Sequence, residues 1–321
     1  MTHRDQIRIE NWQAVQAGLL SPVYDAECRR WDTALGWDFA PSCRIVEEGR
    51  QDGRVPGLVA REGDGRLAGW CFYVLHDGLL QIGALAGDRP EVLGGLIRAT
   101  LATPDAAAAR GVTCFLFPAS AHLGRTLERY QFAVEPHAFL ARDWPIGTEG
   151  TVPDIGSSID GLCWRALEGV DVETIASLMA LSFAGQEDAR CYAPDGRLDQ
   201  WTHYVGQLLL TPACGRFLPA ASFALEAADG SAVGAVLTTA IGSHTAHVAQ
   251  IVVHPHYRGR GLARCLIEAG AGAAARAGLP GISLLVARSN DGACRLYGRM
   301  GFVERAVFLS GRRSAVPGRA W

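Results

Sequence analysis

The sequence contains no lysine, so all thirty of its basic residues are arginine. They are balanced by 33 acidic residues, and the formal net charge is −3. A nucleic-acid-binding domain normally carries clustered cations on a basic background. This charge balance gives no support to a nucleic acid as partner, although residues 257–264 contain three arginines.

Three further patterns are absent, and each absence excludes a class of protein. The nine cysteines are odd in number and widely spaced, with no Cys-x-x-Cys pair, which argues against a disulfide framework, a zinc ribbon or a redox motif. No stretch approaches the ~18 apolar residues of a membrane-spanning helix. The polar first residues lack the apolar core of a signal peptide. We therefore expect reduced thiols, no membrane association and a cytoplasmic location.

The length indicates two globular domains. The chain has 321 residues, 49% hydrophobic and 20% charged, and domains average ~150 residues. Residues 146–161 combine Pro, Gly, Ser and Thr without helical or strand periodicity, which is typical of a linker. We predict a first domain at 1–145 and a second at 162–321, each able to bury its own core, in a monomer or a homodimer.

Hydrophobic periodicity predicts the order βααβββαβαβ for the second half, an α/β (α+β) arrangement. Its expected strands are 163–167, 222–226, 232–241, 247–253, 282–287 and 302–309, and its expected helices are 171–183, 198–210, 261–277 and 291–300. The first half repeats the later part of this order. There we expect strands at 58–61, 67–75, 80–85, 112–117 and 133–141, and helices at 90–109 and 123–130. A duplicated fold is the simplest explanation.

A glycine-rich loop connects the strand 247–253 to the helix 261–277. The loop reads Arg258-Gly259-Arg260-Gly261-Leu262-Ala263. Backbone N–H groups at a helix start have no intrahelical acceptor and lie at the positive end of the helix dipole, so they bind phosphate oxygens. Glycine allows a phosphate to approach the backbone closely. A dinucleotide-binding motif is the alternative, but it needs a third Gly or Ala where Arg264 stands.

A second motif lies downstream, with Asn290, Ala293, Leu296-Tyr297 and Gly301-Phe302 in register. Together the two motifs resemble the GNAT superfamily of acyl-CoA-dependent N-acyltransferases over about residues 220–310. The resemblance implies tandem domains, each with a mixed, mainly antiparallel central sheet flanked by helices. It implies acetyl-CoA or another acyl-CoA as co-substrate, held by the loop 258–263 and by Asn290.

The resemblance also implies catalytic roles. Tyr297 would protonate the departing thiolate, since a phenol keeps its proton at neutral pH. Backbone N–H groups of Ile251, Val252 or Val253 would polarise the thioester carbonyl. A glutamate that relatives use to drain the amine proton is replaced by Ala249.

The general base is therefore open. Gln250 could orient water, and His244, His247 and His254 could titrate near neutrality. The spacing His244-x-x-His247 also permits a metal interpretation. It lies on a turn and a strand rather than on a helix, so we expect no metal.

The first half departs from the family at these positions. Asp88 and Glu91 stand where phosphate would lie, and no tyrosine follows Leu127. We interpret it as a degenerate copy. The acceptor, expected to be a small-molecule amine, would contact the segment 185–197. A non-catalytic CoA-binding sensor, or different acyl-CoA chemistry such as decarboxylation, are the alternatives.

Overall fold

The computed structural model describes residues 7–143, 153–167, 172–186, 188–210 and 214–314. Within them, one sheet runs through both halves of the chain in the order β1-β2-β3-β4-β5-β14-β6-β13-β12-β11-β10-β8-β7, and β9 pairs with β11. Most neighbours are antiparallel, and β4–β5 and β12–β13 are parallel. The structure therefore has the expected mixed, mainly antiparallel sheet, but the sheet is shared.

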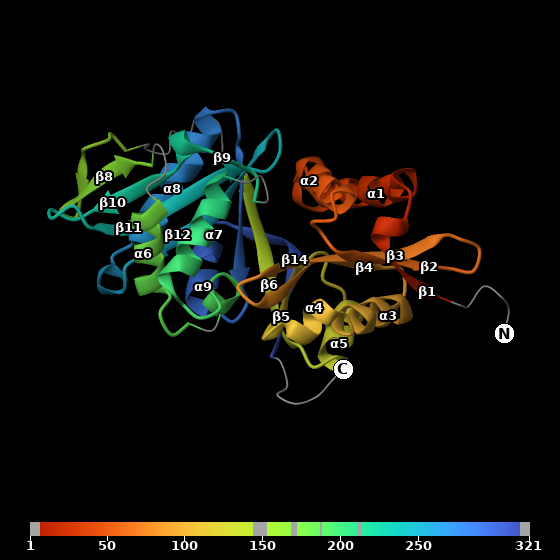
Figure 1. Ribbon diagram of the computed structural model, residues 1–321. Helices are drawn as coiled ribbons and strands as arrows, with labels where there is room; N and C mark the ends of the chain where they lie inside the picture. The colour runs from red at the N-terminus through yellow and green to blue at the C-terminus, as the bar shows by residue number, and fades with distance from the viewer. Residues whose placement is uncertain (1–6, 144–152, 168–171, 187, 211–213, 315–321) are drawn as a thin grey trace.

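The first half places helices on both faces of its strands. Its strands are β1 Arg8–Asn11, β2 Gly57–Arg61, β3 Leu67–His76, β4 Leu79–Gly87, β5 Gly111–Leu116 and β6 Ala133–Asp143. Its helices are η2 Trp12–Ala14, α1 Ala17–Leu35, α2 Ala40–Gln51, α3 Pro90–Leu101, α4 Pro104–Ala108 and α5 Ala121–Arg129. Figure 1 shows α1 and α2 on one face and α3 to α5 on the other. Leu20 of α1 and Leu96 of α3 are fully buried in the two corresponding cores.

The second half repeats this layering. Its strands are β7 Ser158–Ile159, β8 Leu162–Ala166, β9 Arg216–Phe217, β10 Phe223–Glu226, β11 Ala232–Ala240, β12 Thr245–Val253, β13 Gly281–Ala287 and β14 Val303–Ser314. Its helices are α6 Val172–Ser182, η3 Asp188–Cys191, α7 Leu198–Leu210, η4 Pro219–Ala221, η5 Pro255–Tyr257, α8 Leu262–Arg276 and α9 Asp291–Arg299. Along β11, Leu237 packs in the core under α6 and α7, whereas Val236 packs in the core under α8. Alternate side chains thus face opposite helix layers.

The last strand of each half lies in the sheet of the other half. β6 pairs with β13 over seven residue pairs, Gly281↔Asp143 to Ala287↔His137, and β14 pairs with β5 from Leu309↔Leu116 to Ser314↔Gly111. The two exchanged strands also pair with each other, and they cross the centre of the molecule in Figure 1. The sheet is therefore continuous through both halves, and the exchanged strands contribute Leu309 to a core of the first half and Ala138 and Leu140 to a core of the second. Residues 146–152 of the expected linker lie outside the described residues, and its end contains β7.

The expected helix 90–109 is two helices in the structure. α3 ends at Leu101 and α4 begins at Pro104. Proline disfavours a helical conformation at the residue before it and cannot donate an N–H, which breaks the helix there. The Thr103 hydroxyl caps α4 by accepting from the Ala106 N–H at 3.2 Å.

An aromatic cluster joins the two halves. Trp37, Phe139 and Phe308 are buried together with Leu35 and Ile241. Because Phe139 lies on β6 and Phe308 on β14, the cluster forms where the exchanged strands meet. The Asp38 N–H also donates to the Ile241 carbonyl at 2.6 Å. This contact fixes the loop after α1 against the second half.

Candidate active site

Two parallel strands separate at their carboxyl ends in the second half. β12 pairs with β13 only from Thr245↔Gly281 to Val248↔Leu284. Beyond that point β13 continues along β6, whereas β12 continues along β11 to Gly234↔Val253. The edge of β12 over residues 249–253 therefore has no partner in β13. An opening flanked by backbone polar groups results.

A bulge at Ala249 redirects β12 at the start of this opening. Leu237 of β11 pairs with Gln250, and the next residue, Thr238, pairs with Val248, so Ala249 is unpaired. A bulge bends its strand and reorients the following residues. The Gln250 side chain turns back, accepting from the Ile251 N–H at 3.1 Å.

Alternation along the antiparallel pair shows which N–H groups face the opening. The His254 N–H donates to the Val233 carbonyl at 2.8 Å. Every second residue bonds across such a ladder, so the Val252 N–H points to β11, whereas those of Ile251 and Val253 point away from it. Ile251 is already bonded to Gln250. Of the three expected donors, Val253 is thus the one whose N–H remains directed to the opening.

The glycine-rich loop follows β12 directly. Gly259 and Gly261 have φ of +79° and +81°, a left-handed conformation that favours glycine. Gly261 is the N-cap residue of α8 and offers no side-chain cap, and a Cβ at either glycine would meet nothing within 4 Å. The N–H groups of Leu262 and Ala263 lie in the first turn of α8, where they have no intrahelical acceptor. This geometry suits a phosphate group.

Two arginines of the loop have defined contacts. Arg258 donates to the Ser182 carbonyl at 2.6 Å and to the Val253 carbonyl at 3.3 Å, which links α6, β12 and the loop. The Arg260 guanidinium lies 3.4 Å from Asp160 and 5.0 Å from the centre of the Tyr257 ring. Arg258 therefore braces the loop as well as adding positive charge beside it.

Tyr297 lies on α9, which follows β13. Its side chain is 6% exposed, and its ring packs 6.0 Å from that of Phe302. Burial, with a smaller contribution from Cys294, raises the pKa of Tyr297 to about 12, so the phenol keeps its proton throughout the physiological range. Within the described residues its hydroxyl makes no hydrogen bond. Asn290 caps this helix, accepting from the Ala293 backbone N–H at 3.1 Å, which explains the asparagine at this position.

The three histidines considered as bases occupy different environments. His247 is 4% exposed, stacks on Phe139 and bonds to Ser283 at 3.0 Å; burial lowers its pKa to about 3. It is therefore neutral and enclosed. His244 precedes β12, so it lies at the opposite end of this nine-residue strand from the loop. His254 follows β12, and its ring accepts from the His256 N–H at 3.3 Å.

Neither a metal centre nor a membrane span is found in the described part of the chain. No three His, Cys, Asp or Glu side chains there come together as metal ligands. No helix among those residues is long and apolar enough to cross a membrane.

Comparison with known proteins gives a family match within the second half. Residues 184–302 match the acetyltransferase (GNAT) family model. The carboxy-terminal half carries a GNAT-family domain. No curated protein sequence matches the chain.

Solved GNAT structures resemble the whole chain in fold. A GCN5-related N-acetyltransferase from Sphaerobacter thermophilus is 19% identical with a TM-score of 0.66, and the match covers 100% of this chain and 99% of that one. A tandem GNAT protein from the clavulanic acid biosynthesis pathway is 14% identical with a TM-score of 0.63, covering 98% and 100%. At these identities the likeness shows the fold alone, a tandem GNAT arrangement.

The first GNAT-like half repeats the opening without the phenol. β4 pairs with β5 only from Leu79↔Gly111 to Ile82↔Cys114, and Gly83 is skipped in the pairing with β3. The Phe132 N–H donates to the Leu127 carbonyl at 3.1 Å, as the Phe302 N–H does to Tyr297 at 3.0 Å. Leu127 thus occupies the place of Tyr297. α3 begins at Pro90, only two residues after Asp88, so this half lacks the long loop.

The first half contacts the segment expected to bind the acceptor. Arg110 forms a 2.7 Å ion pair with Asp195, which belongs to the segment 185–197. His76 of β3 stacks on His203 of α7 with ring centres 3.9 Å apart. Residue 187 and the side chains of Asp188 and Cys191 lie outside the described structure. The first half therefore holds part of this segment in place.

Proposed function

We propose that the protein is an acyl-CoA-dependent N-acyltransferase that moves an acetyl or other short acyl group to an amine of a small molecule. One observation carries the proposal: the glycine-led start of α8 and the helix α9, which carries Tyr297, follow two adjacent parallel strands at the end where those strands separate. β12 and β13 are parallel, so their carboxyl ends lie at one edge of the sheet, and the loop and α9 follow those ends.

The loop is proposed to hold the pyrophosphate of the co-substrate. The first-turn N–H groups of Leu262 and Ala263 would donate hydrogen bonds to its oxygens, with Arg258, Gly259, Arg260 and Gly261 shaping and charging the loop. The arm that carries the thioester would then extend between β12 and β13 toward α9. The N–H of Val253 is the donor that would polarise the thioester carbonyl as negative charge develops on its oxygen.

The chemical step needs one acid and a neutral amine. The amine nitrogen attacks the carbonyl carbon, a C–N bond forms and the C–S bond breaks. The Tyr297 hydroxyl gives its proton to the leaving sulfur. The proton lost by the amine passes to water, and the phenol regains one from solvent. Holding both substrates in line supplies much of the acceleration.

Position 249 carries alanine in place of the glutamate that could act as a base, and His247 is enclosed and neutral. The enzyme would therefore take the amine in its free-base form, with Gln250 available to hold a water. Activity should then rise with pH as more of the amine loses its proton. A plateau is expected above the pKa of the acceptor amine.

The test is turnover of acetyl-CoA and longer acyl-CoAs against a panel of primary amines, including amino acids, amino sugars and polyamines. Free CoA should be quantified by chromatography, because the protein's nine cysteines would react with thiol reagents. Acyl-amine and CoA formed in equal amounts would support the proposal. Tight CoA binding without turnover of any amine would favour the non-catalytic sensor instead.

A further inference from the structure

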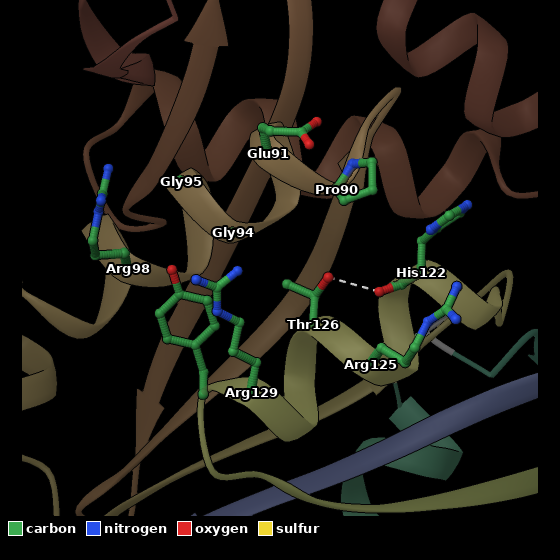
Figure 2. Close-up of a pocket in the computed structure, with 10 residues that line it drawn as sticks. Pro90, Glu91, Gly94, Gly95, Arg98, His122, Arg125, Thr126 and Arg129 are labelled. Atoms are coloured by element: carbon green, nitrogen blue, oxygen red, sulfur yellow. Dashed lines mark hydrogen bonds between the residues drawn. The ribbon is translucent and has the colours of Figure 1, made fainter.

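Two free thiols face each other between α1 and α2 of the first half. Cys28 lies on α1 and Cys43 on α2, and their sulfur atoms are 3.7 Å apart. Among the cysteines that the structure describes, no other two share a hydrogen bond. Figure 1 places α1 and α2 on the face of the sheet opposite α3 and α5, between which lies the groove shown in Figure 2. The thiol pair is therefore separate from that groove and from the loop 258–263 of the second half.

Contacts on both sides of the thiol pair hold the two helices in register. The Tyr24 hydroxyl, one turn before the cysteine of α1, donates at 2.9 Å to the carboxylate of Glu47, one turn after the cysteine of α2. Glu47 is itself fixed by a 2.7 Å ion pair with the buried Arg50. On the other side of the pair, Trp31 stacks on Phe39 with ring centres 4.1 Å apart. Side chains three or four positions apart share one face of a helix, so these contacts bracket the two sulfurs.

The two sulfurs differ in their access to solvent. Cys28 is partly exposed, whereas Cys43 is 7% exposed and belongs to the core that contains Leu20 and Trp70. Burial, with a smaller contribution from Cys28, raises the pKa of the Cys43 thiol well above its ordinary value, so Cys43 keeps its proton. A small oxidant therefore reaches Cys28 first, with the second thiol already in contact.

We propose that Cys28 and Cys43 form an oxidative modification site, at which hydrogen peroxide converts the two thiols into a reversible disulfide. The Cys28 sulfur attacks a peroxide oxygen, the O–O bond breaks, and a sulfenic acid and a water form. The Cys43 sulfur then attacks the Cys28 sulfur, the S–O bond breaks, and the departing hydroxyl leaves with the Cys43 proton as a second water. The two thiols lose two electrons, which reduce the peroxide.

The contact between the sulfurs favours the disulfide over further oxidation. A sulfenic acid without a neighbouring thiol is oxidised on to sulfinic acid, which thiols do not reduce. Cys43 is held beside Cys28 in the folded protein, so the second step is intramolecular and needs no encounter with another molecule. This site does not depend on the proposed acyl transfer.

The disulfide would close the α1–α2 hairpin beside its contact with the second half. The chain between the two cysteines contains Trp37 of the aromatic cluster and Asp38, whose N–H bonds to Ile241. A cross-link between residues 15 positions apart restricts the unfolded chain. The oxidised protein should therefore unfold at a temperature about 5 °C higher than the reduced protein.

The experiment treats the reduced full-length protein with hydrogen peroxide, alkylates the remaining thiols and digests the protein with trypsin without reductant. Cleavage after arginine gives the peptides 9–29 and 31–44, which contain Cys28 and Cys43 as their only cysteines. Mass spectrometry should find the two peptides joined, with a mass two hydrogens below their sum, and dithiothreitol should separate them. Recovery of Cys28 only as the alkylated thiol or as sulfinic acid, in protein whose exposed Cys163 has been oxidised, would overturn the proposal.

Matched variants separate the pair from general thiol oxidation. Cys28→Ser changes the more exposed partner and should abolish both the joined peptides and the rise in unfolding temperature. In Cys43→Ser, Cys28 should instead be trapped by dimedone as the sulfenic acid. Cys163→Ser changes an exposed cysteine on β8 and should behave as the wild type. An equal rise in unfolding temperature in Cys28→Ser and in Cys163→Ser would show that this pair is not the oxidised site.

Discussion

Removing the hydroxyl of Tyr297 should separate binding from chemistry. Tyr297→Phe keeps the ring that packs on Phe302 and leaves no hydrogen-bond partner unsatisfied in the described structure, so stability should change by less than about 1 kcal/mol. Loss of a general acid slows a chemical step by about 10²- to 10⁴-fold, or about 2.7 to 5.5 kcal/mol in the barrier. CoA affinity should not change, because the proposal assigns the hydroxyl to the leaving sulfur and not to the phosphates.

The measurement is single-turnover CoA release, with CoA affinity determined by calorimetry. Since the pKa of Tyr297 is raised to about 12, the wild-type rate should show no decline due to this group up to pH 10. Tyr130→Phe, after α5 in the first half, is the matched control and should react at the wild-type rate. A Tyr297→Phe rate equal to that of the control would refute the role of Tyr297 as the acid.

Two further predictions concern stability. Burial lowers the pKa of His247 to about 3, whereas the unfolded chain takes up this proton near pH 6.5, so unfolding binds a proton between these values and stability falls on acidification. In urea titrations from pH 6 to pH 4, the free energy of unfolding of His247→Gln should fall less steeply on acidification than that of the wild type, by up to about 1.4 kcal/mol per pH unit. An unchanged slope would contradict the buried neutral state. A truncated chain that begins at Thr151 lacks β6 and exposes the edge of β13, so it should aggregate or unfold; a soluble monomer with a cooperative unfolding transition would contradict the shared sheet.

The loop and α9 could be predicted because their functions depend on local sequence. Gly259 and Gly261 adopt a left-handed backbone conformation that favours glycine, and Asn290 is a helix cap. Residue type and spacing therefore indicate these local structures. The strand exchange could not be predicted in the same way. Residues 132–140 and 302–309 both encode a strand after a phenylalanine, but a strand pattern does not specify the partner strand.

Elements of the first 57 residues were missed for a different reason. α1 contains Gly18 and Pro22 in its first turns and has no side-chain cap at Gln16, so the usual signals of a helix start are absent. Its position is determined by burial of Leu20 and Tyr24 against the sheet. The environment of His247 could not be predicted from the sequence either, since its neighbour Trp37 comes from the other half of the chain.

The central claim is that the start of α8 binds the phosphates of acyl-CoA, and calorimetry of CoA with two aspartate variants tests it most directly. Gly261 and Gly278 lie at opposite ends of α8, with φ of +81° and +85° and open space around both. The same substitution therefore causes similar backbone strain at each. Gly261→Asp places a negative charge in the phosphate site and should weaken CoA binding by about 100-fold or more, whereas Gly278→Asp should bind CoA as the wild type does. Equal CoA affinity in the two variants would contradict the account.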